Sequence, residues 1–117
     1  MHELSIATAI VERAEETARF HGGRVTAVRV RVGEMAGVVP DALRFSFEVA
    51  VEGTALESVR LLVEEVPARA RCAPCGTGFA VGMPPLLWCP RCDRPAQELV
   101  EGRELEVTAI ELEEASV

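Results

Sequence analysis

Residues 72–92 read CAPCGTGFAVGMPPLLWCPRC and contain the four cysteines of the chain as two Cys-x-x-Cys pairs, 13 residues apart. Cys72 and Cys75 form the first pair, and Cys89 and Cys92 form the second. Two residues between cysteines allow a tight turn to aim both sulfurs at one point, about 2.3 Å from a metal ion. In a reducing cytosol, four thiols spaced in this way favour a metal site over disulfides. The spacing therefore predicts a four-thiolate site, and zinc is the metal that it favours.

All four ligands are cysteines, which leaves no position open for water, so the site is expected to be structural rather than hydrolytic. A rubredoxin-like iron site uses similar turns, but it usually has glycine after the second pair, where this chain has Asp93. A redox dithiol needs only one pair, in a thioredoxin-like context that is absent here. We expect a ribbon hairpin between the pairs, with Phe79, Val81 and either Leu87 or Trp88 covering the site.

Hydrophobic periodicity predicts two helices and three strands outside this stretch. Apolar residues recur every three or four positions in the helical segments and alternate with polar ones in the first strand, where Val28, Val30 and Val32 face one way. Gly22-Gly23 ends the first helix, and Pro40 suits the first turn of the second. The helices are expected at residues 4–21 and 40–51, and the strands at 24–33, 57–66 and 102–112.

The order of these elements predicts an α+β fold in which two helices cover a three-stranded mixed sheet. A strand–helix–strand sequence implies a right-handed crossover and a parallel pair, and the last strand is expected to be antiparallel. The cysteine-rich stretch is then an inserted zinc-ribbon-like module. We expect one domain from residues 1–66 plus 100–117 and a second, zinc-binding domain from residues 67–99.

The composition limits the class of protein. The chain has 117 residues and a formal net charge of −7, which disfavours binding to nucleic-acid phosphates. No apolar run approaches the length that crosses a bilayer, and the first residues do not form a secretory signal, so we expect a cytoplasmic protein without a membrane partner. No catalytic set of nucleophile, base and orienting residue is evident, and no phosphate-binding loop, so an enzyme is not expected.

The N-terminal residues form a second candidate site. The free amine of Met1, the backbone nitrogen of His2 and its imidazole can close adjacent chelate rings in one plane. Nitrogen donors in a tetragonal arrangement suit Ni(II) or Cu(II), and the Irving–Williams order would favour copper at the same donors. Glu3 offers a further backbone nitrogen or a carboxylate as the fourth ligand. By itself, however, a histidine at position two is common in an unstructured chain end.

Taken together, these features resemble the HypA/HybF family of hydrogenase-maturation nickel metallochaperones over essentially the whole chain. The order of the motifs is more specific than any one of them. The matching segments are Met1-His2-Glu3-Leu4-Ser5, Val30-Arg31-Val32-Gly33-Glu34, Ala42-Leu43-Arg44-Phe45-Ser46-Phe47-Glu48 and the two cysteine pairs.

The resemblance implies a nickel carrier that binds Ni(II) at the N-terminus through Met1, His2 and Glu3. It also implies Zn²⁺ held by the four cysteines, a partner GTPase of the HypB type, and delivery to the precursor of the [NiFe]-hydrogenase large subunit; in some relatives the pathway feeds urease. Some members have an aspartate near the nickel at the start of the second helix. Asp41 lies slightly later than that position, and Glu34 is a further acidic candidate.

Two other expectations follow from the residues around these sites. Asp41 suits a first-turn carboxylate on a helix dipole at least as well as a nickel ligand, and for Glu34 we favour a solvated charge at the end of a strand. No histidine flanks the cysteine pairs, so imidazole cannot replace thiolate there. The alternative to a nickel carrier is a zinc-ribbon interaction or regulatory module without a nickel role.

Overall fold

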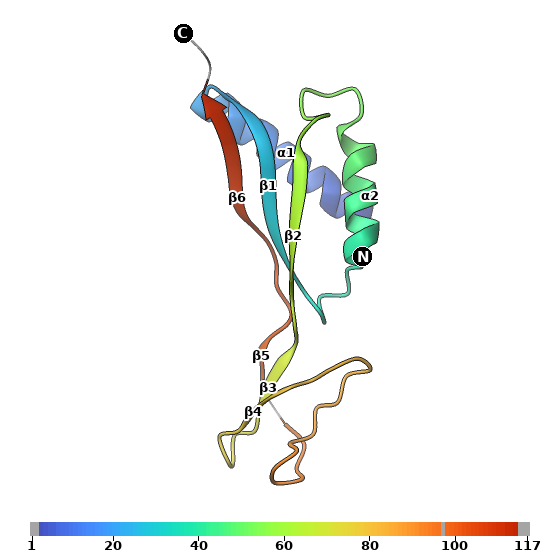
Figure 1. Cartoon of the computed structure of the whole chain (residues 1–117), viewed down its shortest axis with the longest axis vertical. Coiled ribbons are helices and arrows are strands. Elements are labelled where there is room, and N and C mark those ends of the chain that lie inside the picture. Colours follow the sequence, from blue (N-terminus) through green and yellow to red (C-terminus); the bar gives the residue numbers. More distant parts are fainter. Residues whose placement is uncertain (1–2, 97, 115–117) are drawn as a thin grey trace.

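The computed structural model describes residues 3–96 and 98–114, which form two three-stranded sheets. The elements in chain order are α1 (Glu3–His21), β1 (Gly23–Gly33), α2 (Pro40–Val51), β2 (Arg60–Val66), β3 (Arg69–Arg71), β4 (Gly78–Ala80), β5 (Glu98–Glu101) and β6 (Leu105–Glu114). Figure 1 shows the two sheets following one another along a molecule of 62 × 26 × 15 Å. No helix in this described part is long and apolar enough to cross a membrane.

The first sheet has the strand order β2-β1-β6 and carries both helices. β1 is parallel to β2 and antiparallel to β6, which confirms the mixed sheet predicted from the sequence. Figure 1 shows α1 running obliquely behind the strands and α2 on the β2 side. The bounds of α2 are those predicted, and α1 differs by one residue. The α+β fold class is therefore confirmed.

The core lies between the helices and one face of this sheet. Val28, Val30 and Val32 of β1 are buried, as their alternation with arginines predicted. Ala7 and Ala14 of α1 are fully buried; such small side chains let a helix approach closely at a crossing. The other buried members of this cluster are Ile10, Val11, Val25, Val38, Leu43, Phe47, Val51, Leu56 and Val59.

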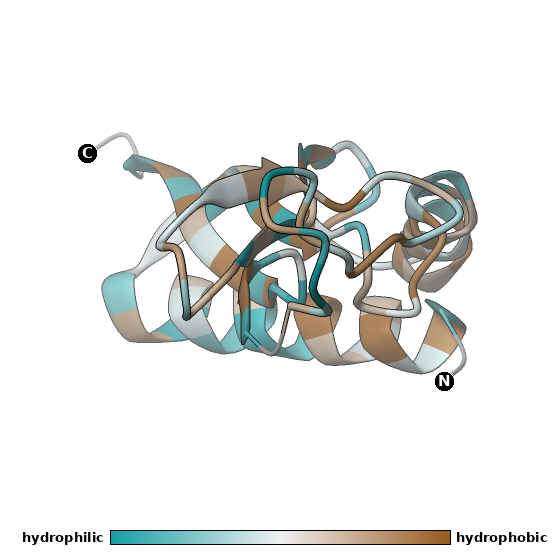
Figure 2. Ribbon diagram, turned by 90° about the horizontal axis from the view of Figure 1, so that it is seen from below, coloured by the Kyte–Doolittle hydropathy of each residue, from teal (hydrophilic) through white to brown (hydrophobic). Residues whose placement is uncertain are grey.

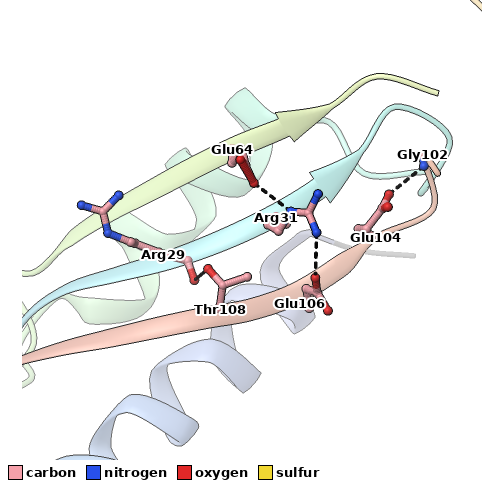
Figure 3. Close-up of polar contacts among 7 residues, drawn as sticks. All are labelled: Arg29, Arg31, Glu64, Gly102, Glu104, Glu106 and Thr108. Carbon is pink, nitrogen blue, oxygen red and sulfur yellow. Dashed lines mark hydrogen bonds and ion pairs between the residues drawn. The ribbon is translucent and has the colours of Figure 1, made fainter. Parts of the chain in front are cut away.

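The opposite face of the sheet carries arginines paired with glutamates. The Arg31 guanidinium donates from Nε to Glu64 of β2 at 2.8 Å and from Nη1 to Glu106 of β6 at 3.4 Å, so it ties the central strand to both neighbours (Figure 3). The hydrogen bond to Glu64 raises the pKa of Arg31 above its ordinary value. On the same face, Thr108 donates to the Arg29 carbonyl at 3.3 Å. Ion pairs between such exposed side chains contribute little to stability, because water and salt screen them.

Two predicted strands begin later than expected. β2 starts at Arg60 rather than at residue 57, because the preceding residues turn, with the Val59 N–H bonded to the Leu56 carbonyl at 3.0 Å. β6 starts at Leu105 rather than at residue 102, because Gly102 has a φ of 123° and directs the chain between the two sheets. Val59 continues the alternation of Leu61 and Val63 into the first of these turns, which placed the start of β2 too early. Residues 102–104 contain no apolar residue, so the alternation in this segment begins only at Leu105, where β6 starts.

The second sheet is small, with the order β4-β3-β5 and antiparallel pairing throughout. The hairpin predicted between the cysteine pairs is wrong. β3 and β4 instead pair around the first cysteine pair, and a bridge between Trp88 and Pro95 encloses the second. The reason is that each Cys-x-x-Cys turn reverses the chain, so the segments on its two sides become neighbours.

Glycines bring the backbone into close contact where the two sheets meet. A Cβ on Gly33 would lie 2.1 Å from the Gly102 carbonyl oxygen, and a Cβ on Gly102 would lie 2.6 Å from Cα of Ala68. Backbone hydrogen bonds of 2.7 Å, from Gly33 to Glu104 and from Met35 to Gly102, close the contact. This junction holds the cysteine-rich sheet in a defined position relative to the helices.

Candidate metal centre

Two chain reversals with the same backbone pattern place the cysteines. In the first, the Cys72 N–H bonds to the Thr77 carbonyl at 2.9 Å, and the Gly76 N–H bonds back to the Cys72 carbonyl at 2.7 Å. In the second, the Cys89 N–H bonds to the Arg94 carbonyl at 2.7 Å, and the Asp93 N–H bonds back to Cys89 at 3.0 Å. We call residues 72–77 and 89–94 the first and second knuckles.

The fifth residue of each knuckle has a left-handed backbone. Gly76 has a φ of 73° and Asp93 a φ of 57°, and Asp93 is the non-glycine residue with positive φ in the described part of the chain. Aspartate tolerates this region better than most residues. The absence of glycine after the second pair therefore leaves the knuckle geometry intact, and it does not separate a zinc site from a rubredoxin-like iron site.

The knuckles bring four sulfurs together. The four Sγ atoms lie within 4.8 Å of one another, with 3.3 Å between Cys72 and Cys92 and 3.7 Å between Cys75 and Cys89. A tetrahedral zinc ion with bonds of about 2.3 Å needs sulfur–sulfur distances of about 3.8 Å, close to these values. All four cysteines are free thiols. The arrangement can therefore hold a metal ion such as zinc, with every ligand supplied by the chain.

The thiols differ in their surroundings. Cys72 and Cys89 are fully buried, whereas Cys75 is exposed. The Thr77 hydroxyl, 3.2 Å from Cys75 Sγ, and the Thr77 backbone N–H stabilise the thiolate and lower the pKa of Cys75 to about 6. The hydrogen bond with Cys72, followed by burial, raises the pKa of Cys92 to about 12. A bound cation favours four thiolates at once, so its binding releases protons.

Apolar residues surround the sulfurs on the inner side. Phe79 and Val81 are buried in the same cluster as Cys72 and Cys89, as the sequence predicted. The prediction that Leu87 or Trp88 covers the site is wrong, because these side chains are 39% and 45% exposed. Ala68, Ala70, Met35 and Leu99 complete the packing around the knuckles.

The predicted nickel ligands lie only partly within the described chain. Met1 and His2 lie outside the described residues. Glu3 begins α1, and its Oε2 accepts a long hydrogen bond of 3.5 Å from the Val39 N–H at the start of α2. The two helices therefore begin beside each other, and α1 is preceded by Met1 and His2.

The two further acidic candidates have structural partners. Asp41 receives a 2.6 Å hydrogen bond from Arg44, and its side chain is 93% exposed. This agrees with the role of a first-turn carboxylate. Glu34 Oε1 accepts a hydrogen bond from the Ala68 N–H at 3.0 Å, which joins the two sheets. Glu34 is exposed directly after the end of β1, as we expected from the sequence. The additional contact with Ala68 had no signal in the sequence, because the two residues become neighbours only on folding.

Comparison with known proteins places the chain in one family. A family described as "Hydrogenase/urease nickel incorporation, metallochaperone, hypA" matches residues 1–112. A hydrogenase maturation factor HypA of Streptomyces avermitilis is 50% identical over 117 residues, covering 97% of this chain and 88% of the relative. A protein of the same name from Chloroflexus aurantiacus is 51% identical over 112 residues, covering 95% of this chain and 98% of the relative.

A solved structure has the same fold. The solution structure of the Ni metallochaperone HypA from Helicobacter pylori has a TM-score of 0.65 and 19% sequence identity, and the likeness covers 98% of this chain and 100% of that one.

Proposed function

This chain belongs to the HypA family of hydrogenase/urease nickel-incorporation metallochaperones, and from that premise we propose that it is a nickel carrier for the maturation of a [NiFe]-hydrogenase. It binds Ni(II) at its N-terminus and releases it to the precursor of the hydrogenase large subunit. The observation that carries this proposal is a family match that begins at Met1 and so includes Met1-His2-Glu3.

The nickel ligands are the amine of Met1, the backbone nitrogen and imidazole of His2, and a group of Glu3. The start of α1 at Glu3 supports this assignment. The first N–H groups of a helix have no acceptor within the helix, so the Glu3 nitrogen is free of the helical hydrogen-bond network. The positive end of the helix dipole also stabilises the negative charge of an amide that loses its proton on nickel binding.

The cysteine site has the opposite task of keeping its metal. Cys72, Cys75, Cys89 and Cys92 would hold zinc as four thiolates, and two of them are fully buried. The strands of this sheet have only three or four residues each, too few to form a stable core alone. We therefore assign residues 67–99 to a separate domain whose folding depends on the metal, beside a nickel-binding domain of residues 1–66 and 100–117.

The partners in this proposal are a GTPase of the HypB type and the large-subunit precursor, and the place of action is the cytoplasm. The chain acts as a carrier rather than as an enzyme. Residues 67–99 hold four arginines against Asp93 and Glu98, a charge of +2, so the rest of the chain carries −7 − 2 = −9. Outside residues 67–99 the charge therefore favours partner surfaces rich in arginine or lysine, and added salt should weaken that attraction.

A transfer experiment tests the proposal. The chain is loaded with one equivalent of Ni²⁺ and mixed with purified large-subunit precursor and the GTPase with GTP, and nickel in the re-isolated precursor is measured by elemental analysis. We expect transfer from the wild type and from His21→Ala, which removes the other histidine, but not from His2→Ala. Equal transfer from all three proteins would contradict a nickel site at the N-terminus.

A further inference from the structure

The cysteine-rich sheet carries an exposed apolar segment that the metal site does not use. Residues 83–88, here called the apolar loop, read Met-Pro-Pro-Leu-Leu-Trp. The exposed fractions are 66% for Met83, 64% for Leu86, 39% for Leu87 and 45% for Trp88. Figure 2 views the molecule from this end and shows apolar stretches in the loops that face the viewer. Contiguous patches of exposed apolar side chains commonly mark interaction sites.

The apolar loop is held in place by its own hydrogen bonds. The Leu86 N–H donates to the Val81 carbonyl at 3.0 Å, and the Leu87 carbonyl accepts from the Ala96 N–H at 2.8 Å. The Trp88 indole Nε1–H donates to Asp93 at 2.6 Å, which fixes the ring against the second knuckle. A partner would therefore meet a preformed surface, and little conformational entropy would be lost on binding.

The charges beside the loop indicate the chemistry of the partner. Arg91 and Arg94 belong to the knuckle that follows Trp88, and neither forms an ion pair with any residue that the structure describes. Asp93 lies between them and already accepts the hydrogen bond of the Trp88 indole, so this knuckle carries two arginines against one carboxylate. A surface of exposed leucine, methionine and tryptophan beside free arginines is complementary to an apolar pocket with carboxylates at its rim. The net charge of −7 opposes both a second copy of this chain and an anionic membrane.

The apolar loop also lies on the side of the molecule where the two helices begin. In Figure 1 it extends beneath the N-terminal end of α2, and Figure 2 shows it over the same end from below. The contact between Glu3 and Val39 places the start of α1 at that end. A protein seated on the loop therefore lies on the same side as the start of α1.

We propose that the apolar loop is a docking surface for a partner protein that presents an apolar pocket rimmed by carboxylates. Leu86, Met83 and Trp88 fill the pocket, and Arg91 and Arg94 pair with its rim. The choice of partner proteins for the test rests on the proposed function, whereas the surface itself rests on exposure, anchoring and charge. Tryptophan and arginine are the residue types that most often dominate binding energy at such surfaces.

Binding measurements with exposed-residue variants test this proposal. The zinc-loaded chain is titrated calorimetrically with the purified HypB-type GTPase and, separately, with the purified large-subunit precursor. We expect the double variant Met83→Ser/Leu86→Ser to bind one of them about tenfold more weakly or worse, with unchanged zinc content. Phe20→Ser, which removes an 85% exposed side chain at the far end of α1, is the matched control and should bind as the wild type does. Arg91→Glu/Arg94→Glu should weaken the same complex.

Four outcomes would overturn the proposal. The first is that the wild type binds neither protein, and the second is that the loop variant binds both as tightly as the wild type does. The third is a wild-type dimer in sedimentation that the loop variant converts to monomer, which would make a second copy the occupant. The fourth is loop-dependent binding to phosphatidylserine vesicles. Nickel titration of the loop variant separates the proposals, because the docking surface can fail while nickel still binds at the N-terminus.

Discussion

The Glu34 carboxylate accepts a hydrogen bond of 3.0 Å from the backbone N–H of Ala68, and this contact joins the two sheets. Ala68 is fully buried, so water cannot easily replace the acceptor if the carboxylate is removed. In return, the Glu34 N–H donates to the Val66 carbonyl at 2.9 Å. Glu34 therefore fixes the turn after β1 to the connection between β2 and β3, next to the glycine contacts of the junction.

Glu34→Ala should destabilise the protein by about 1–3 kcal/mol, because it leaves a buried N–H without an acceptor. Glu34→Gln keeps an acceptor oxygen and should recover most of that loss. Glu12→Ala, at an exposed position on α1, is the control and should change the free energy of unfolding by less than about 0.5 kcal/mol. Urea unfolding of the four proteins measures these values, and an undisturbed Glu34→Ala would show that the contact contributes nothing.

Gly102→Ala should be far more damaging than an alanine at another glycine with positive φ. The new Cβ would lie 2.6 Å from Cα of Ala68, and the backbone on either side cannot move without opening the junction. Gly37→Ala has a comparable left-handed backbone, with φ of 77°, but no atom within 4 Å of the new Cβ. We expect a loss of about 1–2 kcal/mol for Gly37→Ala from backbone strain alone and at least about 3 kcal/mol for Gly102→Ala. If thermal or urea unfolding gave equal losses of stability for the two variants, the close approach of Gly102 to Ala68 would be contradicted.

Removing one buried thiolate should unfold the cysteine-rich sheet while sparing the helices. Cys89→Ser replaces a fully buried ligand, so zinc content should fall well below one equivalent and amide exchange should become fast in β3, β4 and β5. The core around α1 and α2 contains none of the cysteines and should keep its protection. Full zinc content, or loss of protection over the whole chain, would refute the four-thiolate site or the two-domain division respectively.

Glu104 should make stability depend on pH in the acid range. Three interactions lower the pKa of Glu104. The largest is a hydrogen bond between its carboxylate and its own backbone, the second is a hydrogen bond of 2.7 Å that the carboxylate accepts from the Gly102 N–H (Figure 3), and the third is the positive charge of Arg31. Because the folded pKa lies below the unfolded one, this stabilisation is complete above the unfolded pKa and disappears as pH falls through the folded pKa.

The comparison with Glu104→Gln isolates this effect, because both proteins lose metal alike at low pH. The wild type should be the more stable protein near pH 7, and its advantage should shrink as the pH falls below about 4.3, the ordinary pKa of glutamate. Urea midpoints along a pH series measure it. An advantage that stays constant or grows toward acid would contradict the lowered pKa.

The elements of the first sheet could be predicted because their residues repeat with the period of their secondary structure. Val28, Val30 and Val32 alternate with arginines, and Pro40 marks the start of α2 where the structure has it. The four-cysteine site could be predicted as well, because the spacing of the cysteines favours two turns that direct their sulfurs at one point.

The junction and the second sheet could not be read in this way. Gly33, Ala68 and Gly102 are far apart in sequence, and their close approach exists only after folding. Strands of three residues are too short to show an alternation of apolar and polar residues. β3 and β4 pair with each other only because the first knuckle, which lies between them, reverses the chain. The exposure of Leu87 and Trp88 was not predicted, because apolar residues close in sequence to metal ligands usually pack against the site.

The central claim is that zinc stays bound at the four cysteines while nickel binds separately at the N-terminus, and nickel titration tests it most directly. Calorimetric titration with Ni²⁺ would compare three zinc-loaded proteins: the wild type with a free Met1 amine, His2→Ala, and His21→Ala as the control for the other histidine. We predict one nickel bound by the wild type and by His21→Ala, affinity for nickel lower by at least about tenfold in His2→Ala, and four-cysteine zinc unchanged in all three. Equal nickel affinity in the three proteins, or nickel that binds only by displacing zinc from the cysteines, would contradict it.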